Sequence, residues 1–497
     1  MQIDSTSCVP SAGDTSCPQS RHRASGTETK HKMDRLCAGC GICAGICPSG
    51  HIRMAFSDAQ GFFLPTASCS DCPSRCRIAE KVCPFGRENP TSAQVPQEVF
   101  SQTPGIAFDP VAGYYVESYV GRSDKHCVKS ASGGLATWLL VDLLTKGDID
   151  GVVCVGNDPL SPTRFSYRIC KTVEEVRACS GSCYQPVEIS DCIRAMLSAE
   201  GRYAVVALPC IARGLRHSMK AMPGLANQIK YILGLTCGGL SSRHAVESVI
   251  NKLCPTYYPE NIVFRHKTAS SDPRVFRYAM RFDKTGTAAC SSRQKPDDLP
   301  VSDLYEPEIL LWSAGLANAI HGGAFMLDAC TCCDDVFAEC ADATFMDAWL
   351  EEYMHVPGGT SLALVRTSAL VDHINAAVAS GQLSVTLIDI SRVLESQSGV
   401  IAKKRGRAPY NAAAFRRQGI RVPPVRGVKY SVKSAFRYWM ERKYRTAVRR
   451  ALTLHPSEPQ RAAKAGLPWR VPLFLFRLRE AWPVLWPKIA FRLKGTL

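Results

Sequence analysis

The chain has 497 residues, 24 of them cysteines, and a formal net charge of +16 at pH 7. Its 46% hydrophobic and 21% charged residues are typical of a globular protein with a real core, and this length is enough for two or three domains. No stretch has 18 or more consecutive apolar residues, so no transmembrane helix is predicted.

Residues 1–33 are polar and rich in serine and threonine, which predicts a disordered leader. They contain no apolar segment of the kind that an export signal needs. We therefore expect a cytoplasmic protein in a reducing compartment. In that setting we expect its cysteines to bind metal as thiolates rather than to form disulfides.

A motif for an iron–sulfur cluster follows the leader. Its cysteines have the spacing C-x2-C-x2-C-x3-C-P, which is that of bacterial ferredoxins: Cys37, Cys40, Cys43, Cys47 and Pro48. Each iron of a [4Fe–4S] cubane needs one protein thiolate, and the short spacings let consecutive cysteines surround one cluster. Zinc is the alternative, but zinc motifs pair two C-x2-C units across a longer gap. The motif predicts a ferredoxin-like domain over residues 34–95.

A second, more widely spaced set of cysteines lies in the same domain: Cys69, Cys72, Cys76 and Cys83, with Pro84 after the last. In ferredoxins with two clusters, the fourth cysteine of each run serves the other cluster. This pattern predicts one cluster on Cys37, Cys40, Cys43 and Cys83, and another on Cys69, Cys72, Cys76 and Cys47. The wider spacing leaves a single cluster as the alternative.

Residues 105–400 alternate between helix-like and strand-like segments, which predicts an α/β domain with a largely parallel sheet. The fold class is therefore α/β, or mixed α and β, behind the ferredoxin-like head. The predicted helices are 133–146, 187–199 and 242–252, and the predicted strands are 151–156, 203–208, 229–235, 262–265, 277–282 and 361–366.

Several segments of this domain, in their order after such a head, resemble the family of coenzyme F-420 hydrogenase/dehydrogenase beta subunits. They are YVESYVGRSDKHCVKSASGGLATWLLVDLLTK (115–146), GSCYQP (181–186), VVALPCIARGL (205–215), LTCGG (235–239) and ACTCCDDVFAECADATFMDAW (329–349). The resemblance implies an oxidoreductase that binds FAD and one or two [4Fe–4S] clusters. It also implies that electrons pass between a one-electron carrier and a two-electron substrate.

The resemblance further implies that flavin-binding residues are Ser132, Gly133, Gly134, Ser182 and Tyr184. Two glycines that open a helix also favour phosphate binding on physical grounds, because backbone N–H groups approach the anion there. The alternative is that Ser132 is an ordinary N-cap.

Some positions depart from the family pattern or allow two interpretations. The family often has polar side chains where this chain has Leu208–Ile211 and Cys237–Gly239. Cys330 and Cys333 match a family cysteine pair that either binds a cluster or packs a turn. Asp347 is interpreted as structural. His244 and His321 are interpreted as surface histidines, with a role as a proton or hydrogen-bond donor as the alternative.

Residues 401–497 form a basic helical tail with 24 Lys/Arg and three acidic residues, against a net charge of −5 for the first 400 residues. A basic helix is predicted over 433–454, with Phe436, Trp439, Met440, Tyr444 and Val448 on an apolar side. Such a segment suits an anionic membrane surface or the acidic groove of a protein partner. It is also consistent with a solvated extension, and nucleic acid is the least favoured partner.

These patterns predict an iron–sulfur flavoprotein that accepts electrons from a ferredoxin-like donor. Some related bacterial proteins occur with polysaccharide-modifying enzymes, so a sugar-linked substrate is one hypothesis. A second hypothesis is the flavin-binding component of a deazaflavin-dependent hydrogenase or dehydrogenase. A third is a non-catalytic iron–sulfur protein that interacts with a membrane complex through its tail, at the inner face of the membrane.

Overall fold

The computed structural model describes residues 36–69, 72–74, 76–86, 94–253, 259, 261–267, 280–282, 323–426, 432–455 and 458–459. The predicted leader lies outside these ranges, as do His321 and most of the chain after residue 455. The head contains α1 (Ile42–Gly45), β1 (Met54–Ser57), β2 (Phe62–Pro65), α2 (Ile78–Val82) and α3 (Gln94–Phe100), followed by the hairpin of β3 (Ala107–Asp109) and β4 (Gly113–Tyr115).

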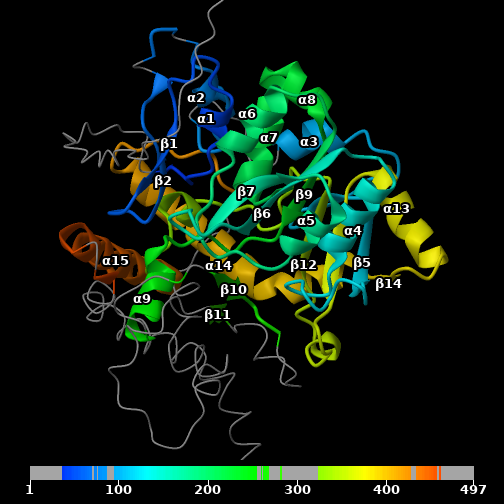
Figure 1. Cartoon of the computed structure of the whole chain (residues 1–497). Coiled ribbons are helices and arrows are strands. Elements are labelled where there is room, and N and C mark those ends of the chain that lie inside the picture. The colour runs from blue at the N-terminus through cyan, green and yellow to red at the C-terminus, as the bar shows by residue number, and fades with distance from the viewer. Residues whose placement is uncertain are drawn as a thin grey trace, which may run out of the picture.

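The main domain is built on one eight-stranded sheet with the order β14-β5-β13-β12-β9-β8-β6-β7 (Figure 1). The strands are β5 (Glu117–Arg122), β6 (Gly151–Asn157), β7 (Phe165–Cys170), β8 (Tyr203–Ala207), β9 (Ile229–Leu235), β12 (Ala343–Asp347), β13 (Ser361–Val365) and β14 (Ser384–Leu387). The four central strands, β6, β8, β9 and β12, are parallel, whereas the flanking strands pair antiparallel. The prediction of a parallel sheet is therefore confirmed at its centre and not at its edges.

Helices cover both faces of this sheet, and alternate residues of the central strands face opposite cores. In β8, Ala204 packs with α4 and α13, whereas Val205 packs with α6 and α7. This period of two is what a strand buried on both faces requires. The helices are α4 (Leu135–Thr145), α5 (Val173–Ala178), α6 (Ser190–Leu197), α7 (Pro209–Ala221), α8 (Pro223–Gln228), α9 (His244–Leu253), α12 (Asp328–Thr331) and α13 (Ser368–Ala379).

The head packs directly against α6 and α7, as Figure 1 shows for α1 and α2. The contact is close because two glycines stand where a side chain would not fit. A Cβ atom on Gly41, whose φ is +79°, would lie 2.9 Å from the Ile189 nitrogen, and one on Gly45 would lie 2.8 Å from the Ile193 Cβ. The Ile189 N–H also donates to the Cys40 carbonyl at 3.1 Å. The first cysteine motif is thus fixed to the main domain.

A second attachment joins the β1–β2 hairpin to α9 through His244, which is fully buried. Its Nε2 lies 2.9 Å from the Asp58 carbonyl oxygen, so Nε2 carries the proton, and its Nδ1 lies 3.4 Å from the Ser242 hydroxyl. The interpretation of His244 as a surface residue is wrong, because the hairpin covers the start of α9.

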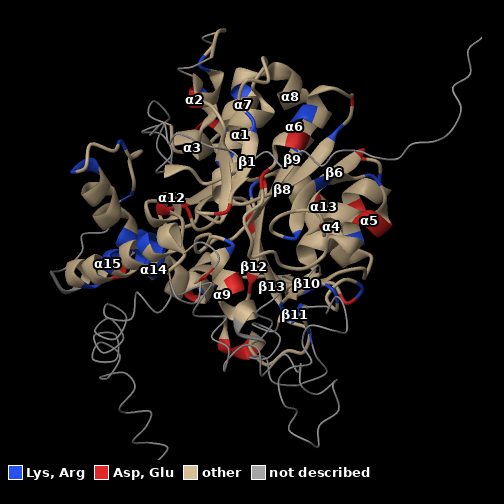
Figure 2. Cartoon of the chain, turned by 60° about the vertical axis from the view of Figure 1, so that its left-hand side comes forward, with Lys and Arg blue, Asp and Glu red and all other residues tan. Residues whose placement is uncertain are grey.

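The basic region begins inside the main domain. Helix α14 (Ile390–Arg416) runs without a break across residues 400 and 401, where a boundary between domain and tail is predicted. Lys404, Arg405 and Arg407 of this helix are buried. Helix α15 (Val432–Leu454) packs against α14, and Figure 2 shows lysine and arginine positions in blue on both helices. Within the described part of the chain, no helix is long and apolar enough to cross a bilayer.

The predicted apolar side of α15 is divided in the structure. Met440, Tyr444 and Val448 are buried, whereas Phe436 and Trp439 remain 48% and 38% exposed. The strands predicted at 262–265 and 277–282 form the small antiparallel sheet of β10 (Ile262–Phe264) and β11 (Met280–Phe282), and residues 277–279 lie outside the described chain.

His244 makes stability depend on pH in a defined interval. Burial lowers its pKa from 6.5 to about 4. Between these values the unfolded chain binds a proton that the native chain does not, so stability decreases as the pH falls from 6.5 to 4. Relative to a His244→Gln variant, we expect the protein to lose up to about 1.4 kcal/mol per pH unit in this interval. Chemical unfolding of both proteins at several pH values in this interval measures the loss. The same dependence of the free energy of unfolding on pH in both proteins would contradict the prediction.

Candidate functional site

The first group of thiols consists of Cys37, Cys40, Cys43 and Cys83. Burial raises the pKa of Cys40 and of Cys43, and repulsion from neighbouring thiolates, including Cys37 and Cys83, raises both further. The Gly39 N–H donates to the Cys37 sulfur at 3.3 Å. Cys83, which follows α2, therefore lies with the first three cysteines of the other run, as the interleaved assignment requires.

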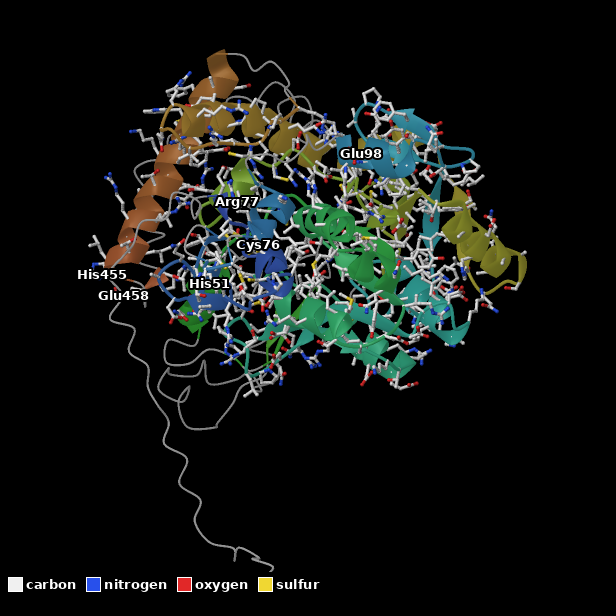
Figure 3. The ribbon with its side chains drawn as sticks, turned by 90° about the horizontal axis from the view of Figure 1, so that it is seen from above. His51, Cys76, Arg77, Glu98, His455 and Glu458 are labelled. Atoms are coloured by element: carbon white, nitrogen blue, oxygen red, sulfur yellow. The ribbon has the colours of Figure 1, made fainter. Side chains whose placement is uncertain are left out.

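The second group consists of Cys47, Cys69, Cys72 and Cys76. The Ser49 hydroxyl connects two of them, at 3.5 Å from the Cys47 sulfur and 3.6 Å from the Cys72 sulfur. Cys47 also packs against the small apolar cluster that contains Cys69, and Cys76 is near enough to raise the pKa of Cys69. Cys76 is exposed, and Figure 3 labels it on the head. The fourth cysteine of the first run thus lies with the second run.

A third group joins Cys330 and Cys333 to two cysteines that no motif singles out as ligands, Cys210 and Cys237. Burial raises the pKa of Cys210, and the thiols of Cys40, Cys330, Cys237 and Cys333 raise it further. Cys210 is at the start of α7, Cys237 follows β9, and Cys330 and Cys333 belong to and follow α12. Proximity to Cys40 places this third group beside the first.

Cations and N–H groups surround the third group. The Leu240 N–H donates to the Cys330 sulfur at 3.3 Å. The buried ammonium of Lys404 donates to the Cys237 carbonyl at 2.9 Å, and its pKa is raised because the neighbouring thiols and Asp335 outweigh the effect of burial. Buried Arg213 is held charged in the same way by Cys333 and its acidic neighbours. Positive charge is therefore available where several thiolates would otherwise repel one another.

The predicted flavin-binding residues lie at the edge of the sheet where the central parallel strands end. A Cβ atom on Gly133 would lie 2.7 Å from both the Gly121 carbonyl oxygen and the Ser361 nitrogen, so the loop before α4 touches the sheet there. Gly134, with φ +82°, is the N-cap of α4. The Ser132 hydroxyl instead donates to the Thr360 carbonyl at 2.7 Å, so the alternative that Ser132 caps the helix is wrong.

Ser182 and Tyr184 reach the same region through β10. Ser182 forms a β-bridge with Phe264, and the ring of Tyr184 meets the ring of Phe264 edge-on at 5.3 Å between centroids. Three residues further on, the Lys267 ammonium donates to the carbonyls of Cys127, Gly358 and Ser132, the last at 2.7 Å. Residues 264–267 thus connect the two predicted groups of flavin-binding residues.

Arg265 and Asp347 form a bidentate ion pair at the centre of this region. Both bonds are 2.8 Å long, and the guanidinium also lies over the ring of Trp349 at 5.8 Å. The pair raises the pKa of Arg265 although burial opposes the charge. The sequence indicates only a structural role for Asp347 and none for Arg265, which has no motif around it.

The donors at this edge fit an anionic cofactor. The Nε of Arg265 and the hydroxyl of Thr236, which follows β9, are buried and have no partner among the described residues. No side chain caps the first turn of α4. A helix N-terminus with an adjacent arginine favours phosphate, and Tyr184, Phe264 and Trp349 supply aromatic surface. These features suit a nucleotide cofactor such as FAD.

The fold and its thiol groups define an α/β protein with a cysteine-rich head. Residues 118–194 match the N-terminal family model, and residues 200–390 the C-terminal family model, of the beta polypeptide of "Coenzyme F420 hydrogenase/dehydrogenase". Together these matches cover more than half of the chain. The chain therefore belongs to the family of coenzyme F420 hydrogenase/dehydrogenase beta subunits, as its motifs predict.

Two curated relatives are a subunit of the F(420)H(2) dehydrogenase of Methanosarcina mazei and the "Coenzyme F420-dependent sulfite reductase" of Methanocaldococcus jannaschii. The first is 23% identical over 46% of this chain and 59% of its own length. The second is 24% identical over 41% of this chain and 30% of its own length. The match therefore spans less than two thirds of the first relative and less than a third of the second. One polypeptide of the F420-reducing [NiFe] hydrogenase complex of Methanosarcina barkeri is similar in structure, with a TM-score of 0.44 and 19% identity over 63% of this chain and 94% of that chain.

Arg426 holds the segment that follows Cys333. It contacts both oxygens of Glu339, at 2.6 and 2.9 Å, and the Asp334 carboxylate at 3.2 Å. Both carboxylates are buried. Because removal of one partner leaves buried charge uncompensated, Arg426→Ala should lower the free energy of unfolding by about 3 kcal/mol.

The matched control for this prediction is Arg392→Ala. Arg392 also contacts two carboxylates, those of Glu352 and Glu395, but at the surface. Its loss should lower the free energy of unfolding much less than the loss of Arg426 does, because water screens ion pairs at the surface. Chemical unfolding compares the two variants, and equal losses would contradict the assigned role of Arg426.

Proposed function

We propose that this protein is an iron–sulfur flavoprotein oxidoreductase that exchanges electrons between a one-electron carrier and a two-electron substrate. The observation that carries the proposal is the succession of three cysteine groups. The second group shares the head with the first, Cys40 of the first lies beside Cys210 of the third, and the third lies where β9 ends. Four thiolates are the usual ligand set of a [4Fe–4S] cluster.

The residues proposed as ligands are the three groups of four. They are Cys47, Cys69, Cys72 and Cys76; Cys37, Cys40, Cys43 and Cys83; and Cys210, Cys237, Cys330 and Cys333. Bound clusters supply one-electron chemistry, and a bound flavin exchanges either one or two electrons. Exposed Cys76 places the second group nearest to solvent, which suits contact with a ferredoxin-like donor.

The flavin is proposed to bind at Ser132, Gly133, Gly134, Ser182 and Tyr184. Arg265 and the first turn of α4 would hold its phosphates, and the aromatic side chains around Phe264 would border its rings. Lys267 would fix the loop before α4 beside the cofactor, through its hydrogen bonds to the carbonyls of Cys127, Ser132 and Gly358. The family and the names of the curated relatives favour coenzyme F420, a deazaflavin, as the two-electron partner, and its exchange with the flavin would take place within a larger complex.

The basic region supports a peripheral attachment. The rings of Phe436 and Trp439 stack at 5.8 Å on the outside of α15, and the Lys443 ammonium lies 5.7 Å from the Trp439 ring. Exposed aromatic rings beside lysines and arginines suit an anionic membrane surface or an acidic protein partner. A link to polysaccharide synthesis and a non-catalytic role both stay hypotheses.

Iron content tests the third group. We expect anaerobically prepared Cys330→Ser protein to contain about four fewer iron atoms per chain than the unchanged protein, because one cluster loses a ligand. Cys332→Ser is the matched control, since the Cys332 side chain faces Phe415 and Leu36 instead. Iron and acid-labile sulfide analyses measure the difference. Equal iron in all three proteins would contradict the third cluster.

Flavin content tests the edge of the sheet. Arg265→Met should release most of the bound flavin, because it removes the donors proposed for the phosphates. Arg216→Met is the control: Arg216 pairs with Asp342 at 2.9 Å, at the opposite end of β12. Flavin fluorescence after denaturation, with iron as an internal standard, compares the variants. Equal flavin in both would place the cofactor elsewhere, and iron without flavin in the unchanged protein would favour the non-catalytic hypothesis.

A further inference from the structure

A fourth gathering of thiols lies apart from the three proposed cluster groups. The sulfur atoms of Cys154, Cys170 and Cys179 all lie within 4.8 Å of one another. Cys170 is central, at 3.7 Å from the Cys154 sulfur and 3.7 Å from the Cys179 sulfur. None of the three belongs to the motifs that identify the head or the family.

Three different elements supply these thiols. Cys154 is on β6, Cys170 ends β7, and Cys179 follows the last residue of α5. Because Cys170 pairs with Val152 in the antiparallel register, Cys154 and Cys170 are diagonal neighbours on the same face of the sheet. Cys154 is 6% exposed and Cys170 1%, so the site is formed within the core rather than on a loop.

The spacing fits one metal ion. Thiolates at about 2.3 Å from an ion, arranged as a triangle around it, are about 4 Å apart. The observed separations are close to this value. Ligand atoms of a cubane stand further apart, since each of them binds a different iron, so the trio is too compact for a [4Fe–4S] cluster.

The surroundings favour a three-coordinate ion. Among the described residues, no fourth histidine, cysteine, aspartate or glutamate joins the trio at this distance. The carboxylate of nearby Glu175 is engaged instead with the N–H groups of Lys171 and Thr172, at 2.7 and 3.1 Å. The remaining neighbours of the trio are mainly the apolar side chains of the core around α4. Structural zinc takes four ligands, whereas soft thiolates without a fourth donor suit Cu(I).

One cation is placed to offset the negative charge of such a site. A Cβ atom on Gly156 would lie 2.7 Å from the Cys179 sulfur and 2.9 Å from the Nε of Arg168, so both groups lie over this glycine. The guanidinium of Arg168 therefore lies beside the Cys179 sulfur, where its positive charge would offset the negative charge of the thiolates.

We propose that Cys154, Cys170 and Cys179 bind a single soft monovalent metal ion, Cu(I), in a three-sulfur site. The ion would join the edge hairpin of β6 and β7 to the end of α5. The site is independent of the proposed electron path, because it shares no residue with the three cluster groups.

The test uses the full-length protein, prepared without oxygen and with its clusters in place. Cu(I) is added in the presence of the chelator bathocuproine disulfonate, and copper and iron per chain are measured. The unchanged protein should retain one more copper ion than Cys170→Ser or Cys179→Ser, without loss of iron. Cys192→Ser, which removes a buried thiol outside the trio, is the matched control and should retain that ion.

X-ray absorption at the copper edge should show three sulfur ligands in the unchanged protein and not in Cys179→Ser. Because Cys179 is only half-buried, this variant keeps the test valid should Cys170→Ser fail to fold. Several results would overturn the proposal: equal copper in Cys179→Ser and the unchanged protein, copper uptake only with loss of iron, a zinc ion with an oxygen ligand, or a disulfide within the trio.

Discussion

The close packing of the cysteine-bearing loop of the head on α6 and α7 is the contact on which the proposed function depends. Gly41 and Gly45 allow the loop to approach the helices to within van der Waals distance, and the Cys40 carbonyl accepts a backbone hydrogen bond across the contact. Any side chain at Gly45 would overlap Ile193. Because this contact fixes Cys40 against the main domain, it also sets the position of the first thiol group relative to Cys210 and the third group.

Charge balance explains why the basic region is part of the same structure. The buried acidic residues Asp334, Asp335 and Glu339 follow Cys333 in the sequence and contact α14. Lys404, Arg405 and Arg426 lie among them and make hydrogen bonds to carbonyls and carboxylates there. The first part of the basic region is thus buried where it offsets negative charge. Within the described part of the basic region, the outer face of α15 exposes the aromatic rings of Phe436 and Trp439.

The sequence predicts local features of this protein well and distant ones poorly. The helix α4 and the central strands β6, β8 and β9 follow from the residue pattern, whereas the fourth central strand, β12, is not predicted from it. The interleaved assignment of Cys47 and Cys83 comes from the ferredoxin pattern. In the sequence, Cys210 and Cys237 are notable only because the polar residues of the family pattern are missing beside them. Nothing in the sequence links them to Cys330, because it is the order of the strands in the sheet that brings the three cysteines together. Arg265 lies far from Asp347 along the chain, and nothing around it signals the ion pair. The prediction of an exposed His244 is wrong because the hairpin that covers it comes from the head.

The central claim is that three groups of four cysteines each hold a cluster along a path into the main domain. Anomalous diffraction at the iron edge, from crystals grown without oxygen, tests it most directly. The account predicts three separate iron sites, one of them enclosed by Cys210, Cys237, Cys330 and Cys333. Iron confined to the head, or none at all, would contradict it.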